Sequence, residues 1–301
     1  KIINMKRVVY FLACLCAVVF ASCDPDFNKP DSGQDSSESG NTGNTGNSDG
    51  DVSFEMPDDE IGERPADDSY VRISVEMKSQ DSDARYRFSE IVNMNALSAV
   101  DIPDVPDGKY ELYAWADGFS SHKDITFFYD VMEFSCVSFA AGNYAGVSNG
   151  AKTAYYVSQR DVVVDGNKRI DFEMKRPHGA YKVTLRNPQD IMEFNKKGYT
   201  SVVEYSGFLP SGFNVYNERI VDSVTGAGYT VSLPVITDQT GGVCVAEDIV
   251  LCSKSGTVVL VFTIKDDEGN EVYRSSEVEV RLERGTLIEV LHEADLSNEL
   301  N

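Results

Sequence analysis

Histidine and tryptophan are scarce in this chain, which has three histidines and one tryptophan among 301 residues. His122, His178 and His292 lie far apart, and none belongs to a His-x-x-x-His or Cys-His cluster that would indicate a metal site. The sequence also has no Walker-type phosphate-binding loop and no dinucleotide-binding loop. We therefore predict that the protein is not an enzyme and uses no cofactor.

Basic residues are also fewer than acidic residues. The chain has 27 Lys and Arg residues against 49 Asp and Glu residues, which gives a formal net charge of −22 at pH 7. Such a surface repels phosphate groups, so nucleic acid is not an expected partner. For the same reason, we do not expect the protein to bind a membrane through a basic patch.

The apolar run at residues 8–22 is too short to span a bilayer, because it has 15 residues where a spanning helix needs about 20. Lys6 and Arg7 precede the run, and the small residues Ala21 and Ser22 end it, which is the layout of a secretory signal. Residues 1–22 are therefore predicted to be a signal peptide. An uncleaved helix is the alternative.

Cys23 follows this run directly, and the stretch Phe20-Ala21-Ser22-Cys23 resembles a bacterial lipobox. The resemblance implies that the chain is cut just before Cys23 and that the cysteine thiol is acylated. Stable anchoring takes more than one acyl chain, and the diacyl or triacyl cysteine of such lipoproteins meets that requirement. The expected attachment to the outer membrane is thus a lipid on Cys23.

The other cysteines give no framework of disulfides. Two of the six lie in the predicted signal peptide, and Cys136, Cys244 and Cys252 remain after Cys23 is set aside. These three lack the Cys-x-x-Cys spacing of a zinc site. A disulfide between Cys244 and Cys252 across a hairpin stays open.

Residues 23–69 contain few large apolar side chains and many acids. From residue 24 to residue 69 there are 14 acidic residues against Lys29 and Arg64, a net charge of −12. A segment with so little apolar surface cannot offset the entropy lost on ordering, and like charges extend it. We predict a lipidated, disordered linker over 23–69 that holds the folded part away from the membrane.

From Tyr70 onward the hydrophobic pattern has a period of two, as in the alternation of Val71, Ile73, Val75 and Met77 with polar residues. No helix long enough for a β-α-β crossover is predicted after the linker, so the sheets are expected to be antiparallel. The break at residues 176–179 indicates a domain boundary. We predict an all-β protein with two consecutive β-sandwiches, over 70–176 and 177–301.

Aromatic residues gather in two places in the first of these domains. In residues 110–117, large side chains occupy both faces of a predicted strand, which suggests that the strand is covered on both sides. Four aromatic residues are candidates for stacking on a sugar: Trp115, Phe127, Phe128 and Tyr129. Packing in a core or between domains is the other interpretation. If they bind a sugar, the protein is a surface glycan-binding lipoprotein.

Three motifs suggest a known family. They are Tyr-Glu-Leu-Tyr-Ala-Trp-Ala-Asp at 110–117, Lys-Arg-Pro at 175–177 and Leu-Pro-Ser-Gly-Phe-Asn-Val at 209–215. With the lipobox and acidic linker, they resemble the fimbrillin-type lipoproteins of Gram-negative anaerobes over residues 70–296. The resemblance implies two transthyretin-like β-sandwiches at the cell surface. It also implies a role as anchor, tip or stalk subunit of a type V fimbria.

The expected partners, on this resemblance, are other fimbrial subunits joined by β-strand exchange and a host or microbial surface ligand. Stalk precursors of the family are cut after an arginine, which removes the first strand. Here Pro65 follows Arg64 and blocks trypsin-like cleavage, which leaves Arg72 and Arg85 as candidate processing sites. Few residues follow the last predicted strand, which leaves little chain for a donor extension. Both departures favour an anchor or accessory subunit over a stalk subunit. The predicted exchangeable strand is residues 71–77, which would remain in place in an anchor and be removed from a stalk subunit.

The lipobox makes a direct prediction. Palmitate labelling of the expressed protein should require Cys23, because only this cysteine lies directly after the predicted cut. A Cys23→Ser variant should lose both the label and the partition into membranes. A variant that keeps both would show that the protein is not a lipoprotein attached at this residue.

Overall fold

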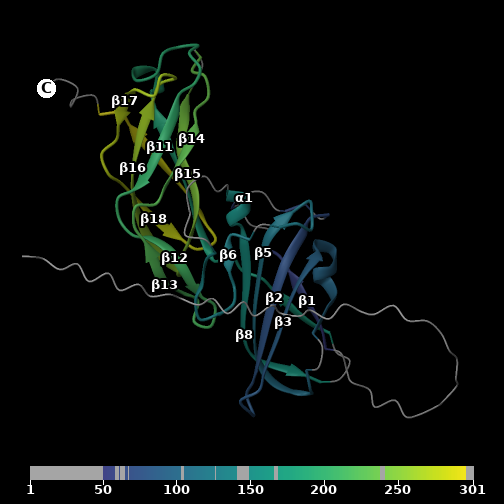
Figure 1. Cartoon of the computed structure of the whole chain (residues 1–301). Helices are drawn as coiled ribbons and strands as arrows, with labels where there is room; N and C mark the ends of the chain where they lie inside the picture. Colours follow the sequence, from purple (N-terminus) through teal and green to yellow (C-terminus); the bar gives the residue numbers. More distant parts are fainter. Residues whose placement is uncertain are drawn as a thin grey trace, which may run out of the picture. The chain divides into compact units, whose positions relative to one another are not determined.

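The computed structural model describes residues 50–295, apart from residues 58–60, 62–64, 67, 103–104, 126, 141–148, 166–168 and 238–240. The predicted signal peptide, Cys23 and most of the predicted linker lie outside the described residues. Strands dominate the described part (Figure 1), and the helical segments are short: η1 (Met94–Ala99), α1 (Asn149–Lys152) and η2 (Pro188–Asp190). None of the described helices is long and apolar enough to cross a membrane.

The first sandwich packs a four-stranded sheet against a three-stranded one. The larger sheet has the order β3 (Arg85–Asn93), β2 (Tyr70–Ser79), β5 (Gly108–Ser120) and β8 (Ala154–Val164). The smaller sheet has the order β4 (Val100–Ile102), β1 (Gly50–Glu55) and β9 (Ile170–Glu173). The alternating apolar residues of β2 lie in the core between them, as predicted: Val71, Ile73, Val75 and Met77.

The second sandwich, formed by later residues of the chain, also consists of two packed sheets. One sheet has the order β15 (Gly242–Leu251), β10 (His178–Arg186) and β19 (Leu287–Glu293). The other has the order β14 (Gly228–Ser232), β11 (Thr200–Tyr205), β16 (Ser255–Lys265) and β17 (Glu271–Arg274), and β18 (Val278–Glu283) also pairs with β16. Their shared core includes Val183, Val203 and Phe262. The predicted fold class, all-β with antiparallel sandwiches, is confirmed.

A fifth sheet takes strands from both sides of the predicted boundary. Its order is β13 (Arg219–Val224), β12 (Leu209–Asn214), β7 (Val137–Phe139) and β6 (Tyr129–Asp130). Gly212 and Phe213 of β12 pair with Ser138 and Val137 of β7. The two sandwiches are therefore joined by backbone hydrogen bonds as well as by the chain that connects them.

This fifth sheet covers the outward face of β5. Tyr113 and Trp115 of β5 lie in an apolar cluster with side chains such as Tyr129 and Phe213, while Leu112 lies in the core of the first sandwich. The prediction that this strand is covered on both faces is confirmed.

The prediction that a disordered linker extends to Ser69 is wrong for residues 50–57. Strand β1 begins at Gly50, pairs in parallel with β9 and antiparallel with β4, and buries Val52, Phe54 and Met56. The average composition of residues 23–69 concealed these three alternating apolar residues. An averaged property cannot detect a short strand that tertiary pairing stabilises.

The place of β2 in its sheet also differs from the expectation. The predicted exchangeable strand, residues 71–77, lies within β2, which is hydrogen-bonded to β3 on one side and to β5 on the other. Both β1 and β2 lie between two partner strands, but β2 pairs along nine residues on each side, whereas β1 pairs along three residues with β4 and four with β9. Removing β2 would therefore break far more backbone hydrogen bonds than removing β1. The first strand of the described chain is β1 rather than β2.

The burial of β1 can be tested by truncating its largest apolar side chain. Phe54 is 4% exposed and stacks on Phe172, with ring centroids 5.9 Å apart. Phe54→Ala should lower the free energy of unfolding by about 3 kcal/mol, because it leaves a cavity in the core. The matched control is Phe208→Ala, since Phe208 is 71% exposed and a surface substitution changes stability by about 0.5 kcal/mol or less. Urea denaturation of both variants measures the difference, and equal stabilities would mean that β1 is not docked in solution.

Candidate strand-exchange and junction site

Strand β1 occupies a slot between two short strands. Its register places Val52 beside Ile170 and Phe54 beside Phe172 in the parallel pairing, and Val52 opposite Val100 in the antiparallel pairing. The backbone N–H of Met174 also donates to the carbonyl oxygen of Glu55 at 2.8 Å. These contacts hold a short strand with two alternating apolar side chains, Val52 and Phe54, by backbone pairing on both sides.

Arg72, one of the two candidate processing sites, lies inside the larger sheet of the first sandwich. Its guanidinium donates to both carboxylate oxygens of Asp117, at 2.8 and 2.6 Å, and to the carbonyl oxygen of Tyr129 at 2.8 Å. The side chain is 14% exposed. A protease must bind its substrate in an extended, accessible form, and the folded chain does not offer Arg72 in that form.

Arg85, the other candidate, is exposed at the first residue of β3. A cut after Arg85 would separate both β1 and β2 from the rest of the chain. Because β2 lies in the middle of its sheet, this cut would remove core residues of the sandwich and not an outer strand. The fold thus gives no support to processing at either arginine.

The candidate sugar-stacking residues are largely buried. Trp115 and Tyr129 are 0% and 1% exposed, and their rings pack edge to face with centroids 5.2 Å apart. Phe128 is half-buried, with ring centroids 4.9 Å from Tyr129 and 4.8 Å from Phe139. Phe127 is half-buried under the guanidinium of Arg72, whose central carbon is 3.9 Å from the ring centroid. The interpretation of Trp115 and Tyr129 as exposed ligand aromatics is wrong.

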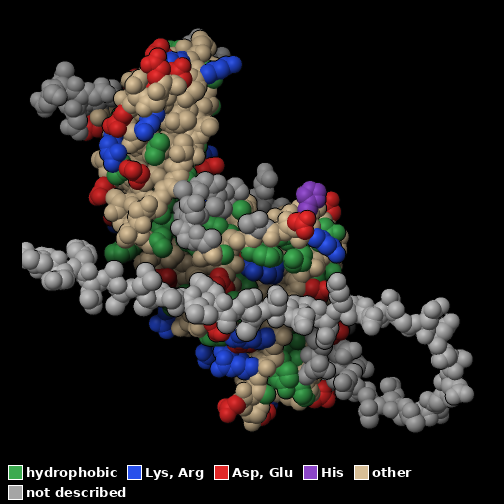
Figure 2. All heavy atoms as spheres, viewed as in Figure 1, with side chains coloured by type: hydrophobic (Ala, Val, Ile, Leu, Met, Phe, Trp, Pro, Cys, Tyr) green, Lys and Arg blue, Asp and Glu red, His purple; other side chains and the backbone are tan. Residues whose placement is uncertain are grey.

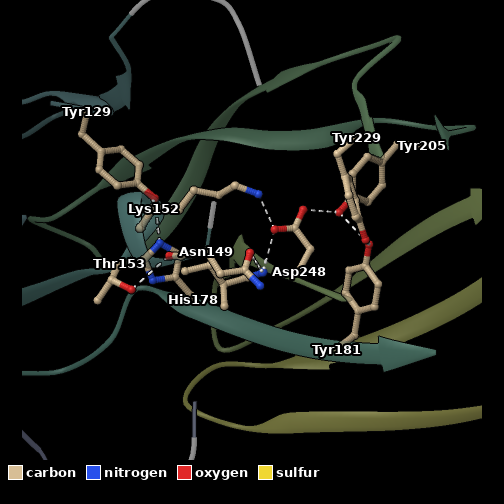
Figure 3. A network of polar contacts seen from close by, with 10 residues as sticks. Tyr129, Asn149, Lys152, Thr153, His178, Tyr181, Tyr205, Tyr229 and Asp248 are labelled. Atoms are coloured by element: carbon tan, nitrogen blue, oxygen red, sulfur yellow. Dashed lines mark hydrogen bonds and ion pairs between the residues drawn. The ribbon is translucent and has the colours of Figure 1, made fainter. Parts of the chain in front are cut away.

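A network of polar side chains, not recognised in the sequence, connects the two sandwiches (Figure 3). Lys152, at the end of α1, forms an ion pair with Asp248 of β15, and the two side chains are 2% and 1% exposed. Asp248 also accepts hydrogen bonds from the hydroxyl of Tyr205 at 2.7 Å and from the backbone N–H of Ile249 at 2.8 Å. The carboxylate of Asp248 is thus paired with one cation and accepts two further hydrogen bonds.

Three tyrosines extend this network on the side of Asp248 away from Lys152 (Figure 3). The hydroxyl of Tyr181 is 2.8 Å from that of Tyr205 and 2.9 Å from that of Tyr229. Burial raises the pKa of Tyr229 well above its ordinary value, and the charge of Asp248 adds to the shift. Tyr229 therefore stays neutral and acts as a hydrogen-bonding group.

On the other side, Tyr129 and His178 share a hydrogen bond of 2.7 Å between the tyrosine hydroxyl and Nε2. The same hydroxyl lies 3.0 Å from the carbonyl oxygen of Lys152. Burial lowers the pKa of His178 well below its ordinary value, and the positive charges of Arg176 and Lys152 act in the same direction. His178 is therefore a neutral, structural histidine at the start of β10.

A second set of charges lies on the outward side of β2. Figure 2 shows acidic and basic side chains interspersed over one face, including basic ones near the positions of β2, β3 and β8 in Figure 1. Glu76 is 2% exposed, and it accepts hydrogen bonds from Tyr216 at 2.8 Å and from Arg87 at 2.6 Å. Burial by itself raises the pKa of Glu76, but these bonds and the charges of Arg87 and Lys78 lower it overall. The hydrogen bond from Tyr216 to Glu76 thereby connects the second half of the chain to β2.

Catalytic arrangements receive no support from the described residues. These contain no group of three or more His, Cys, Asp or Glu side chains placed to hold a metal ion. Residues 146–150 read Gly-Val-Ser-Asn-Gly, which has the Gly-x-Ser-x-Gly form of a nucleophile elbow. Ser148 lies outside the described residues, and the helix after it, α1, has four residues.

Cys136, Cys244 and Cys252 are free thiols, so the disulfide left open between Cys244 and Cys252 is not formed.

Residues 47–293 match a protein family described as "Family of unknown function (DUF6562)". The chain belongs to this family. No curated protein matches the chain. The family description leaves the function open, so it must be argued from the residues.

Several solved structures are similar to this chain. One is the fimbrial anchor protein Mfa2 from Porphyromonas gingivalis, with 16% identity and a TM-score of 0.43 over 75% of this chain and 80% of that chain. Another is a candidate cell adhesion protein from Bacteroides ovatus, with 11% identity and a TM-score of 0.47 over 81% and 91%. A third is a candidate polysaccharide-binding protein from Bacteroides thetaiotaomicron, with 12% identity and a TM-score of 0.43 over 74% and 78%.

The buried ion pair makes a prediction about stability. Lys152→Met removes the cation from a buried carboxylate and should lower the free energy of unfolding by about 3–5 kcal/mol. Replacing both partners, with Lys152→Met and Asp248→Leu, should cost less than the single change, because no buried charge then remains. Urea denaturation of the three proteins measures these differences.

An exposed ion pair of the same protein is the control. Arg281 and Glu279 lie 3.0 Å apart, with side chains 84% and 55% exposed. Arg281→Met should change the free energy of unfolding by about 1 kcal/mol or less, because water screens the pair. Similar losses for Lys152→Met and Arg281→Met would show that Lys152 is not buried against Asp248 in solution.

Proposed function

We propose that this protein is a cell-surface lipoprotein, attached to the outer membrane through Cys23, that serves as an anchor or accessory subunit of a fimbrium. It joins other fimbrial subunits by β-strand addition. The lipobox and the fimbrillin-like motifs support the location and the class of partner. The observation that carries the mechanism is the position of β1, a short strand with buried apolar side chains that is the first strand of the described residues.

Strand β1 replaces residues 71–77 as the element for exchange. It is six residues long and precedes the other described strands. The chain that follows β1 leads into β2 and the rest of the sandwich. In a stalk subunit, a partner's strand with the same alternation would pair with β4 and β9 in its place, whereas in an anchor β1 itself stays between them. Extended peptides commonly add to sheets in this way, with backbone hydrogen bonds for affinity and side-chain pockets for specificity.

An anchor keeps its own first strand, whereas a stalk subunit loses it before assembly. Two features favour retention of β1 in this chain. Pro65 follows Arg64, the arginine nearest to β1 on its C-terminal side, and Arg72 is held in the sheet by Asp117. With β1 in place, the first sandwich is complete and the lipid on Cys23 remains joined to it. The glycan-binding alternative loses its main support, because Trp115 and Tyr129 are buried.

Protein recovered from assembled fimbriae tests this proposal. Mass spectrometry of its N-terminal peptide should find an acylated Cys23 followed by an unbroken chain through residues 50–57. A free N-terminus at Pro65, Ile73 or Tyr86 would instead indicate arginine cleavage and a stalk subunit. Absence of the protein from purified fimbriae of a strain that expresses it would contradict the fimbrial role altogether.

A further inference from the structure

Lys152 and Asp248 bring an amine and a carboxyl group into contact inside the protein. The Nζ atom of Lys152 contacts Oδ1 of Asp248, and this oxygen is bonded to Cγ, the carbon that an amine would attack. Figure 3 shows the lysine side chain extended toward the carboxylate. The two residues are 96 positions apart in the chain, and the fold holds them together. A reaction between groups held in contact is intramolecular, which lowers its entropic barrier.

Little water reaches this pair. The side chains of Lys152 and Asp248 are 2% and 1% exposed. Tyr205 and Tyr181 beside them are 4% and 1% exposed, and the ring centroid of Tyr229 lies 5.7 Å from Nζ of Lys152. In water, hydrolysis opposes the condensation of an amine with a carboxylic acid. A site that excludes water suppresses this back reaction.

Burial also favours the form of Lys152 that can act as a nucleophile, the neutral amine. It lowers the pKa of Lys152, and the charge of Asp248 opposes this shift without cancelling it. Transfer of the ammonium proton to Oδ1 converts the ion pair into an amine and a carboxylic acid, so that two buried charges disappear. The ion pair is therefore one proton transfer away from the reactants of an amide bond.

Two hydrogen-bond donors point at the carboxyl group of Asp248. The hydroxyl of Tyr205 donates to Oδ2 at 2.7 Å, and the backbone N–H of Ile249 donates to Oδ1 at 2.8 Å. Attack of an amine on Cγ places negative charge on Oδ2, the oxygen that Tyr205 already contacts. A donor fixed at the atom where charge develops lowers the barrier of such a step.

We propose that Lys152 and Asp248 form an intramolecular amide bond that joins α1 to β15. The lone pair of Nζ attacks Cγ of the protonated Asp248, which forms the C–N bond and leaves the negative charge on Oδ2. A proton then moves from the nitrogen to the hydroxyl at Oδ1, the Cγ–Oδ1 bond breaks, and Oδ1 leaves as water while the Cγ–Oδ2 double bond forms again. No oxidant, reductant or cofactor takes part.

The ion pair is the state before this reaction, and the amide is the state after it. The amide closes the chain between Lys152 and Asp248 into a covalent loop, which restricts the unfolded chain. The order of stabilities predicted above for the single and double variants is the same in both states. Lys152→Met alone leaves a buried carboxylate, whereas the double variant leaves no buried charge.

Peptide mapping of the full chain tests the proposal, because trypsin does not cut after a lysine whose Nζ is part of an amide. The purified protein is unfolded in urea, digested with trypsin and analysed by mass spectrometry. The amide should give a branched peptide in which residues 124–160 are joined to residues 220–254, with a mass lower than their sum by one water molecule. Separate peptides of residues 124–152 and 220–254, with no branched peptide, would overturn the proposal.

Lys152→Arg is the matched control for this experiment. It keeps a cation beside Asp248, but the guanidinium stays charged and is not a nucleophile. The variant should therefore give only unbranched peptides. A branched peptide of the same composition from Lys152→Arg would show that another residue forms the link, which would also overturn the proposal.

The role of Tyr205 is tested by the rate at which the amide forms. Samples of the full chain are taken at intervals after cell-free synthesis, and the branched fraction is measured in each. Tyr205→Phe should slow the reaction about a hundredfold, because it removes the donor to Oδ2. Tyr181→Phe is the control, since the hydroxyl of Tyr181 contacts that of Tyr205 at 2.8 Å. Equal rates for both variants and the unchanged protein would contradict the role of Tyr205 and leave the amide itself in place.

Discussion

The arrangement of the two sandwiches depends on a charge pair that neither sandwich could bury alone. Lys152 belongs to the first half of the chain and Asp248 to the second, and both are almost fully buried. A single buried charge is costly, so each side chain is stable in the interior only beside the other. Tyr205 donates a hydrogen bond to Asp248, Tyr181 bonds to Tyr205, and His178 Nε2 bonds to the hydroxyl of Tyr129. The pair therefore favours one relative placement of α1 and β15.

Other contacts join the same two halves by different means. The fifth sheet pairs β7 with β12 through the backbone, Tyr216 bonds to Glu76 through side chains, and Ile61 adds an apolar contact. In the role proposed above, between a membrane and a fibre, the two sandwiches must stay together. Backbone pairing, buried charge and apolar packing differ in their dependence on salt and temperature, so a junction that combines them keeps some of its strength when one is weakened.

The sequence predicted those features of the candidate site that depend on neighbouring residues in the chain. It did not predict those that depend on contacts with residues far away in the sequence. The alternation in residues 71–77 correctly predicted a strand with one buried face. The lipobox, which needs only adjacent residues, stays a prediction. The large side chains on both faces of residues 110–117 indicated a strand covered on both sides, but the sequence did not show which distant residues cover Trp115, among them Phe213. Arg72 likewise reads as an ordinary strand cation, although Asp117 of the neighbouring strand binds it on both carboxylate oxygens.

The sequence by itself determined the class of fold, because period-two alternation and the lack of long helices leave antiparallel sheets as the main way to bury the apolar residues. It also determined the acidic character of the chain and the candidate lipid site at Cys23. Only the tertiary structure decided that β1 belongs to the first sandwich, that β2 is an interior strand, and that Ile61 reaches the second sandwich. The physical reason is that a strand's neighbours are set by hydrogen bonds and packing between residues far apart in the chain, which a local pattern does not record.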